Sequence, residues 1–202
     1  MKRAQAVFES IKMSNIQNNI EAVLNDHQLI PVVTINNIEE ADNIVQNLLS
    51  RGIKCIEVTL RTPIAFEAIA YIKANYSDQI KVGVGTIITN EQIVKAEEIG
   101  VDFIVSPGIS QELSYALDKS GIPFIPGVCT PSEIMLGLNI GWKFFKFFPA
   151  SLYGGTSALK TFGAVFPRVK FCPTGGINES TAPDYLALEN VLSVGGSWMV
   201  SK

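Results

Sequence analysis

The sequence predicts an α/β fold of the (β/α)8 barrel class. Its 202 residues fall within the size range of a one-domain α/β barrel. Hydrophobic residues make up 47% of the chain and charged residues only 17%, a composition that indicates a large core. Short apolar, β-branched runs alternate with amphipathic stretches at intervals of roughly 20 to 26 residues, which is typical of strand–helix units in a parallel sheet.

The expected elements follow one another regularly. Ser14 is a candidate N-cap for a helix whose apolar face carries Ile16, Ile20, Val23 and Leu24. Eight strands are expected to begin near Leu29, Cys55, Lys81, Phe103, Phe124, Phe144, Lys170 and Val191. Helices are expected at Glu39–Leu49, Pro63–Ala74, Glu91–Ile99, Gln111–Leu117, Ser132–Ile140, Thr156–Phe166 and Ala182–Leu188. Expected N-caps are Asn90, Ser110 and Thr130, and expected helix-ending glycines are Gly52, Gly100, Gly121 and Gly141.

Eight parallel strands are the number that closes into a (β/α)8 barrel. An open doubly wound sheet is the main alternative, but no Gly-x-Gly-x-x-Gly pattern follows the first expected strand. We therefore expect one barrel domain over 1–202, with 1–26 as an extra N-terminal helical segment. The sequence reaches Lys202 soon after the last expected strand. The final connecting helix is therefore expected to be missing, unless the N-terminal helix covers its place.

Composition excludes several classes of function. Sixteen basic and 19 acidic residues give a net charge of −3, which disfavours nucleic acid as a partner. The single histidine, His27, and the widely spaced Cys55, Cys129 and Cys172 match no metal-ligand or redox motif, so neither a metal nor a cofactor is expected. Three scattered cysteines are typical of reduced thiols. With no signal-peptide pattern and no apolar stretch of membrane length, we expect a cytoplasmic protein with no membrane partner.

Polar side chains on the second expected strand are candidates for catalysis. Alternation along Cys55–Arg61 places Glu57 and Arg61 on the face opposite Ile56 and Val58. Because the apolar face suits the helix layer, Glu57 and Arg61 are expected inside the barrel, where charges are costly unless paired or functional. They are either an ion pair with each other, or an acid/base group and a guanidinium that binds a carboxylate.

Lys146 lies on the sixth expected strand with two phenylalanines on each side, in Phe144–Phe148. Burial among aromatic rings disfavours the charged ammonium and favours the neutral amine, which attacks a ketone to form a Schiff base. The alternatives are a lysine that reaches out to solvent and an ion pair with Glu57. In a barrel, Lys146 and Glu57 are expected to point into the same mouth.

Three further strand ends supply candidate binding groups. Thr86 ends the third expected strand, where it either contacts a ligand or caps the next helix. The seventh and eighth expected strands end in the glycine-rich segments Thr174–Gly176 and Gly195–Ser197. Barrels often bind phosphate through backbone N–H groups of the loops after these two strands, although a Gly-Gly pair alone also marks a turn.

These segments together resemble the 2-keto-3-deoxy-6-phosphogluconate (KDPG) aldolase family. The similarity extends from about His27 to Val200. It rests on the segments Gly52–Thr62, Val84–Thr86, Phe103–Gly108, Ile122–Glu133, Phe145–Ala150, Phe171–Ile177 and Val194–Trp198. Among these, the FKFFPA and PTGGI sequences are highly specific.

The resemblance implies a class I, metal-independent aldolase that cleaves KDPG into pyruvate and glyceraldehyde 3-phosphate, usually as a homotrimer. The family's Schiff-base lysine corresponds to Lys146 and its acid/base glutamate to Glu57. The implied pyruvate-binding residues are Arg61, Thr86 and Lys146. The implied phosphate-site residues are Gly175, Gly176 and Ser197, with Thr174 alongside. The alternative activity is cleavage of unphosphorylated 4-hydroxy-2-oxoglutarate (KHG), or both activities in one enzyme.

Two departures from the family pattern and two rival functions stand beside this expectation. Many members have Glu after the FPA sequence, where this chain has Ser151, and members usually end with a further helix. A phosphosugar isomerase barrel would share the phosphate loops without needing Lys146. A non-catalytic, ligand-binding barrel would tolerate Lys146→Ala without loss of function.

Overall fold

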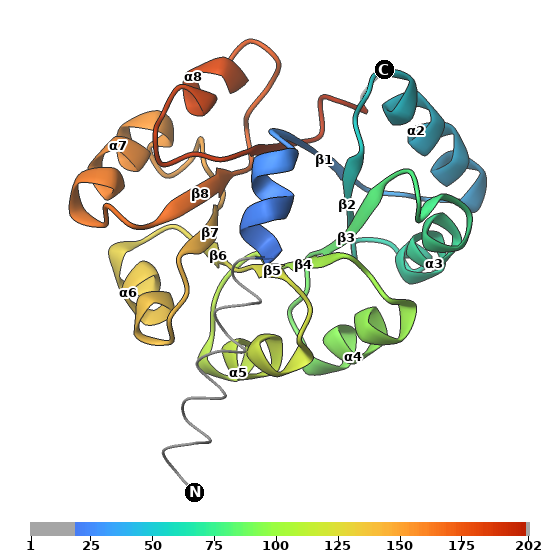
Figure 1. Cartoon of the computed structure of the whole chain (residues 1–202), viewed down its shortest axis with the longest axis horizontal. Coiled ribbons are helices and arrows are strands. Elements are labelled where there is room, and N and C mark those ends of the chain that lie inside the picture. The colour runs from blue at the N-terminus through green and yellow to red at the C-terminus, as the bar shows by residue number, and fades with distance from the viewer. Residues whose placement is uncertain (1–18, 201–202) are drawn as a thin grey trace, which may run out of the picture.

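The computed structural model describes residues 19–200 and confirms an α/β fold. Parallel strands form a ring, and the connecting helices lie outside it (Figure 1). The strands are β1 Leu29–Val33, β2 Cys55–Thr59, β3 Lys81–Gly85, β4 Phe103–Val105, β5 Phe124–Ile125, β6 Gly127–Val128, β7 Phe144–Phe147, β8 Lys170–Pro173 and β9 Val194–Gly196. The helices are α2 Ile38–Ser50, α3 Ala65–Tyr76, α4 Asn90–Ile99, α5 Gln111–Ser120, α6 Pro131–Asn139, α7 Gly155–Val165 and α8 Ala182–Leu186.

Two parallel sheets make up the ring. One has the order β5-β4-β3-β2-β1-β9 and the other β6-β7-β8. Isolated parallel bridges, Phe171 to Val191 and Thr174 to Gly195, connect β8 to the chain around β9. On the opposite side, only Pro126 separates β5 from β6. Because proline has no N–H to donate, it interrupts the ladder, and the single strand expected from Phe124 is divided in two.

Most of the expected boundaries are confirmed. All the expected strand starts coincide with observed ones except the last, which is Val194 rather than Val191. Val191 makes only an isolated bridge, and regular pairing with β1 begins at Val194. The expected N-cap at Asn90 is wrong, because the Thr89 side chain accepts a hydrogen bond from Gln92 N and caps α4. Ser110 and Thr130 cap α5 and α6 as expected.

A helix at 19–26 closes one opening of the ring (Figure 1). Its Ile20 and Leu24 are fully buried. They belong to a cluster of inward-facing side chains at the amino ends of strands, among them Ile30, Cys55, Phe103 and Phe144. The helix therefore packs against the interior and does not cover the place of a connecting helix in the outer layer. Ser14 and Ile16 of the expected helix lie outside the described residues.

Alternation along the strands sorts side chains between the two sides of the ring as expected. Val58 and Phe147 belong to the core between strands and helices, whereas Cys55 belongs to the inner cluster. Glu57 and Lys146 therefore face the interior. Within residues 19–200, no helix has both the length and the apolar character that a membrane span requires.

Candidate active site

Lys146 and Glu57 meet inside the ring. Lys146 Nζ donates to Glu57 Oε1 at 3.1 Å and lies 3.4 Å from Oε2. The two residues are only 6% and 3% exposed. This burial rules out a lysine that reaches solvent, and the partner of Glu57 is Lys146 rather than Arg61. A buried pair of this kind is costly to desolvate, so it adds little stability and suggests a different use.

Glycine makes room for this pair. Gly85 lies on β3 beside Glu57, and a Cβ there would overlap the Glu57 carboxylate. On the other side, the Phe148 ring centroid lies 5.2 Å from Lys146 Nζ, a cation–π distance. The Lys146 ammonium thus has one acidic and one aromatic neighbour. The aromatic neighbour, Phe148, also lines a pocket at the carboxyl ends of the strands.

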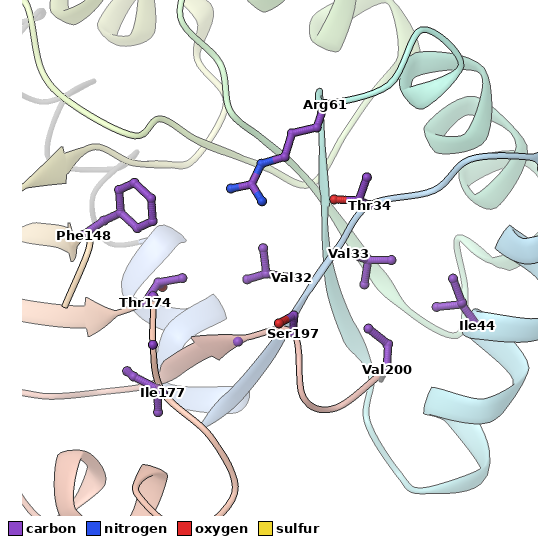
Figure 2. Close-up of a pocket in the computed structure, with 13 residues that line it drawn as sticks. Val32, Val33, Thr34, Ile44, Arg61, Phe148, Thr174, Ile177, Ser197 and Val200 are labelled. Carbon is purple, nitrogen blue, oxygen red and sulfur yellow. The ribbon is translucent and has the colours of Figure 1, made fainter. Parts of the chain in front are cut away.

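A pocket of about 310 Å³ opens at the carboxyl ends of β1, β8 and β9. Figure 2 shows the Arg61 guanidinium reaching across it toward Phe148. The lining residues include four other predicted substrate-binding residues, Thr174, Gly175, Gly176 and Ser197. A guanidinium at one side and glycine backbone at the other can hold two separate anionic groups of one ligand.

The segment after β8 is built for close approach to a ligand. Gly175 and Gly176 adopt φ values of +99° and +73°, which favour glycine. Among the described residues, the Gly176 N–H donates to no protein acceptor. The Thr174 hydroxyl is buried without a hydrogen-bond partner in the described part of the chain. Buried polar groups are rarely left unsatisfied, so the Thr174 hydroxyl is available to a ligand, and the exposed Gly176 N–H is accessible to the same ligand.

Ser151 lies directly against this segment. Ser151 N donates to Gly175 O at 3.1 Å. A Cβ at Gly176 would overlap the Ser151 hydroxyl. The residue that departs from the family pattern therefore borders the expected phosphate site, where it brings a neutral hydroxyl instead of a carboxylate.

Thr86 stands apart from that pocket. It follows Gly85 at the end of β3 and is absent from the pocket lining. Its φ of +66° is unusual for a β-branched residue and costs about 1–3 kcal/mol. Because Thr89 caps α4, the helix-capping role considered for Thr86 is wrong. A strained backbone next to the Glu57 carboxylate is the kind of feature that functional sites retain.

The cysteines are poor rivals to Lys146 as nucleophiles. Burial raises the pKa of the Cys55 and Cys172 thiols. Burial and the neighbouring Glu133 carboxylate raise the pKa of Cys129. All three are free and stay protonated near neutral pH. Within residues 19–200, no three side chains of His, Cys, Asp or Glu gather into a group that could hold a metal ion.

Some pocket residues are not among those that the sequence predicts. Thr34, Val32 and Ile177 line the pocket together with Phe148. Thr34 directly follows β1, so the rule that polar residues at strand ends mark function, which identified Thr86, applies to it equally. The sequence indicates Phe148 only as an aromatic neighbour of Lys146.

The sequence model of the KDPG and KHG aldolase family matches residues 20–202. The chain belongs to this family. The KHG/KDPG aldolase of Escherichia coli K12 is 42% identical over 188 residues, covering 93% of this chain and 88% of that protein. The membership confirms the resemblance seen in the sequence.

Solved structures of KDPG aldolases share the fold. The Legionella pneumophila KDPG aldolase, captured with pyruvate as a covalent carbinolamine intermediate, superimposes with a TM-score of 0.88 at 45% identity, covering 91% of this chain and 88% of that one. The Zymomonas mobilis ZM4 enzyme with 3-phosphoglycerate has a TM-score of 0.88 at 40% identity, covering 92% and 88%.

Proposed function

We propose that the protein is a class I aldolase that cleaves KDPG into pyruvate and glyceraldehyde 3-phosphate through a Schiff base on Lys146. The single observation that carries this proposal is the buried Lys146–Glu57 pair, 3.1 Å apart, beside a pocket with a guanidinium at one side. Membership of the KDPG and KHG aldolase family supports the same chemistry. Neither an isomerase nor a ligand-binding protein requires a lysine in this position.

The first half of the mechanism forms the Schiff base. Glu57 accepts a proton from the Lys146 ammonium, and the neutral amine attacks the C2 ketone to give a carbinolamine. Glu57 then gives its proton to the carbinolamine hydroxyl, which leaves as water, so that an iminium ion forms and Glu57 is again a carboxylate. Because Glu57 lies within hydrogen-bond distance of Nζ before the reaction, the first proton transfer needs no rearrangement of either side chain.

The second half breaks the C3–C4 bond. Glu57 removes the proton of the C4 hydroxyl, directly or through a water molecule. The electrons of the C3–C4 bond move into the iminium, which becomes an enamine, and the aldehyde leaves. Glu57 returns its proton to C3 of the enamine, and hydrolysis of the iminium releases pyruvate and the free lysine.

Binding groups at the two ends of the substrate hold the reacting bond in place. Arg61 and Thr86 bind the C1 carboxylate, the guanidinium by its two parallel N–H groups. The backbone of Gly175 and Gly176 binds the phosphate together with Ser197, while Thr174 supplies an additional hydroxyl. The pocket that contains Arg61 and this glycine segment supports that assignment. Binding energy from the phosphate end orients the bond that breaks.

A second candidate activity is the cleavage of KHG. The name of the E. coli relative covers both substrates, which favours testing both. KHG shares the keto acid and the C4 hydroxyl with KDPG but has a carboxylate in place of the phosphorylated carbon chain. It therefore uses the same Lys146 and Glu57 chemistry and makes no use of a phosphate site.

A direct assay tests the activity. Purified wild-type protein is incubated with KDPG or KHG, and pyruvate release is measured with and without a chelator. We expect pyruvate release from KDPG that the chelator does not reduce. Lys146→Arg keeps a cation beside Glu57 but cannot form a Schiff base at neutral pH, so it should fall to the background rate while remaining folded by circular dichroism. Full activity of Lys146→Arg would overturn the proposal.

Three further proposals concern the fold, the cellular location and the oligomeric state of the protein. We infer that the ring is one (β/α)8 barrel domain in which β5 and β6 count as one strand, which the bridges between β8 and β9 support. The free cysteines support a cytoplasmic location. For the homotrimer that the family resemblance implies, we propose as the contact surface an apolar groove of about 500 Å³ between α5 and α6, lined by Tyr115 and Leu136 among others. Light scattering should give three times the mass of one chain, and a single-chain mass would contradict the trimer.

A further inference from the structure

Thr34 presents a hydroxyl group to the proposed active site. It directly follows β1 and lines the same pocket as Arg61 and Ser197. Its side chain is exposed. Figure 2 shows Thr34 between Arg61 and Ser197, on the side opposite Phe148, with its oxygen turned toward the middle of the pocket. The residue therefore lies between the proposed carboxylate end and the proposed phosphate end of the substrate.

A chain of hydrogen bonds fixes the direction of the Thr34 proton. Thr59 Oγ1 lies 3.0 Å from the Val33 carbonyl oxygen and 3.0 Å from Thr34 Oγ1. A carbonyl oxygen only accepts, so Thr59 uses its single proton for that bond. Thr59 is 1% exposed and has no second proton to offer. The Thr34 hydroxyl must then be the donor to Thr59, and its proton points away from the pocket.

The free side of the Thr34 oxygen consequently carries only lone pairs. Such a group accepts a hydrogen bond from an O–H or N–H donor. Contact between the Thr34 oxygen and a phosphate or carboxylate oxygen is unfavourable, because both oxygens are acceptors. The pocket thus contains one position that favours a hydroxyl over an anion.

We propose that Thr34 is a specificity-determining residue that accepts a hydrogen bond from the C5 hydroxyl of the sugar-acid substrate. This inference rests on the proposed function. The C4 hydroxyl gives its proton to Glu57 and C6 carries the phosphate, so the C5 hydroxyl is the donor that remains between them. KHG has a carboxylate at that carbon. Thr34 therefore favours KDPG over KHG.

Two substrates and two variants test this role. The substrates are KDPG and its 5-deoxy analogue, which keeps the phosphate and lacks only the hydroxyl. Thr34→Val keeps the shape of the side chain and removes the acceptor, whereas Thr34→Ser keeps the hydroxyl. We expect the ratio of kcat/KM for KDPG to that for the analogue to fall by about 2- to 10-fold in Thr34→Val, the value of one neutral hydrogen bond. Thr34→Ser should restore the wild-type ratio.

A matched control separates this effect from a general structural one. Thr62→Val also removes a hydroxyl, one that donates to Ile35 O at 2.6 Å outside the pocket lining. It should change stability and leave the substrate ratio at the wild-type value. A ratio in Thr34→Val equal to that of wild type would overturn the role of Thr34 while wild-type cleavage of KDPG still supports the proposed function. Absence of cleavage by wild type would overturn both.

Discussion

The Glu57 carboxylate occupies the space that a side chain at residue 85 would fill. β2 and β3 are neighbours with Thr59 opposite Gly85 in the ladder. A Cβ on Gly85 would overlap Oε1 of Glu57 and lie 2.8 Å from its Cδ. Two residues earlier on the same strand, a Cβ on Gly83 would overlap the ring of Phe103 instead. Successive inward glycines of β3 therefore make room for the acid and for a core ring.

Gly85→Ala should inactivate the enzyme more than it destabilises it. The added methyl group displaces the carboxylate from Lys146, so we expect kcat for KDPG cleavage to fall by about 10²- to 10⁴-fold, the usual contribution of a general acid–base group. Overpacking should lower the free energy of unfolding by about 1–3 kcal/mol. Gly83→Ala is the control, because it overpacks Phe103 and should lose stability with kcat preserved. Equal kcat values for the two variants would contradict the role of this glycine.

Thr86→Gly should raise the stability of the protein and lower its activity. Glycine adopts the φ of +66° without strain, so thermal unfolding should shift to higher temperature. Loss of the hydroxyl should raise KM for the keto acid. The neighbouring Thr89→Ala removes the α4 N-cap and should lower stability by about 1 kcal/mol with KM preserved. An unchanged KM in Thr86→Gly would show that Thr86 does not contact the substrate.

Ser197→Asp should reduce activity toward the phosphorylated substrate selectively. A carboxylate near the phosphate adds like-charge repulsion of about 1–4 kcal/mol, so kcat/KM for KDPG should fall by about fivefold or more. The neutral variant Ser197→Asn has nearly the same size and should lose less. Both variants are compared with KHG as the second substrate. A similar loss of kcat/KM with KHG would indicate that the phosphate of KDPG does not bind beside Ser197.

Asp102 should make the stability of the protein depend on pH in the acidic range. Burial raises the pKa of its carboxyl group, but bonds from Lys73, Val82 N and Lys81 outweigh burial and lower the pKa overall. Lys73 Nζ and Lys81 Nζ lie 2.8 and 3.1 Å from the carboxylate. Because the folded pKa is lowered, this stabilisation is complete above the unfolded pKa of about 3.9 and is lost as the pH falls through the folded pKa.

Denaturant unfolding of wild type and Asp102→Asn measures this contribution. The difference in the free energy of unfolding should be largest near about pH 7 and should shrink below about pH 4. Lys73→Met should reduce the same pH dependence, since it removes the closer cation. A difference that stays constant over this range would contradict the assignment.

The sequence was sufficient for most of the fold because strand and helix periodicity are local properties. Alternation around Glu57 correctly placed its side chain inside the ring, and the expectation that Lys146 points into the same mouth is confirmed by their contact. The apolar pattern of Phe124–Val128 predicts a single strand. Whether Pro126 divides that strand depends on which N–H groups pair with the neighbouring strands, and apolar character does not indicate this.

Contacts within the site were harder to predict because they depend on register between distant strands. Glu57 and Lys146 are separated by 89 residues, and a pair with Arg61 was equally compatible with the pattern of β2. The packing of Ser151 on Gly176 likewise depends on two loops meeting. Thr34 is not among the predicted site residues, although its position directly after β1 follows from the sequence.

The most direct test of the central claim is to trap the Schiff base. The protein is incubated with pyruvate and borohydride, digested, and mapped by mass spectrometry, with Lys146→Arg treated in parallel. We predict one reduced pyruvate adduct, on Lys146, and none in Lys146→Arg. An adduct on another lysine, or no adduct in a preparation that cleaves KDPG, would contradict the account.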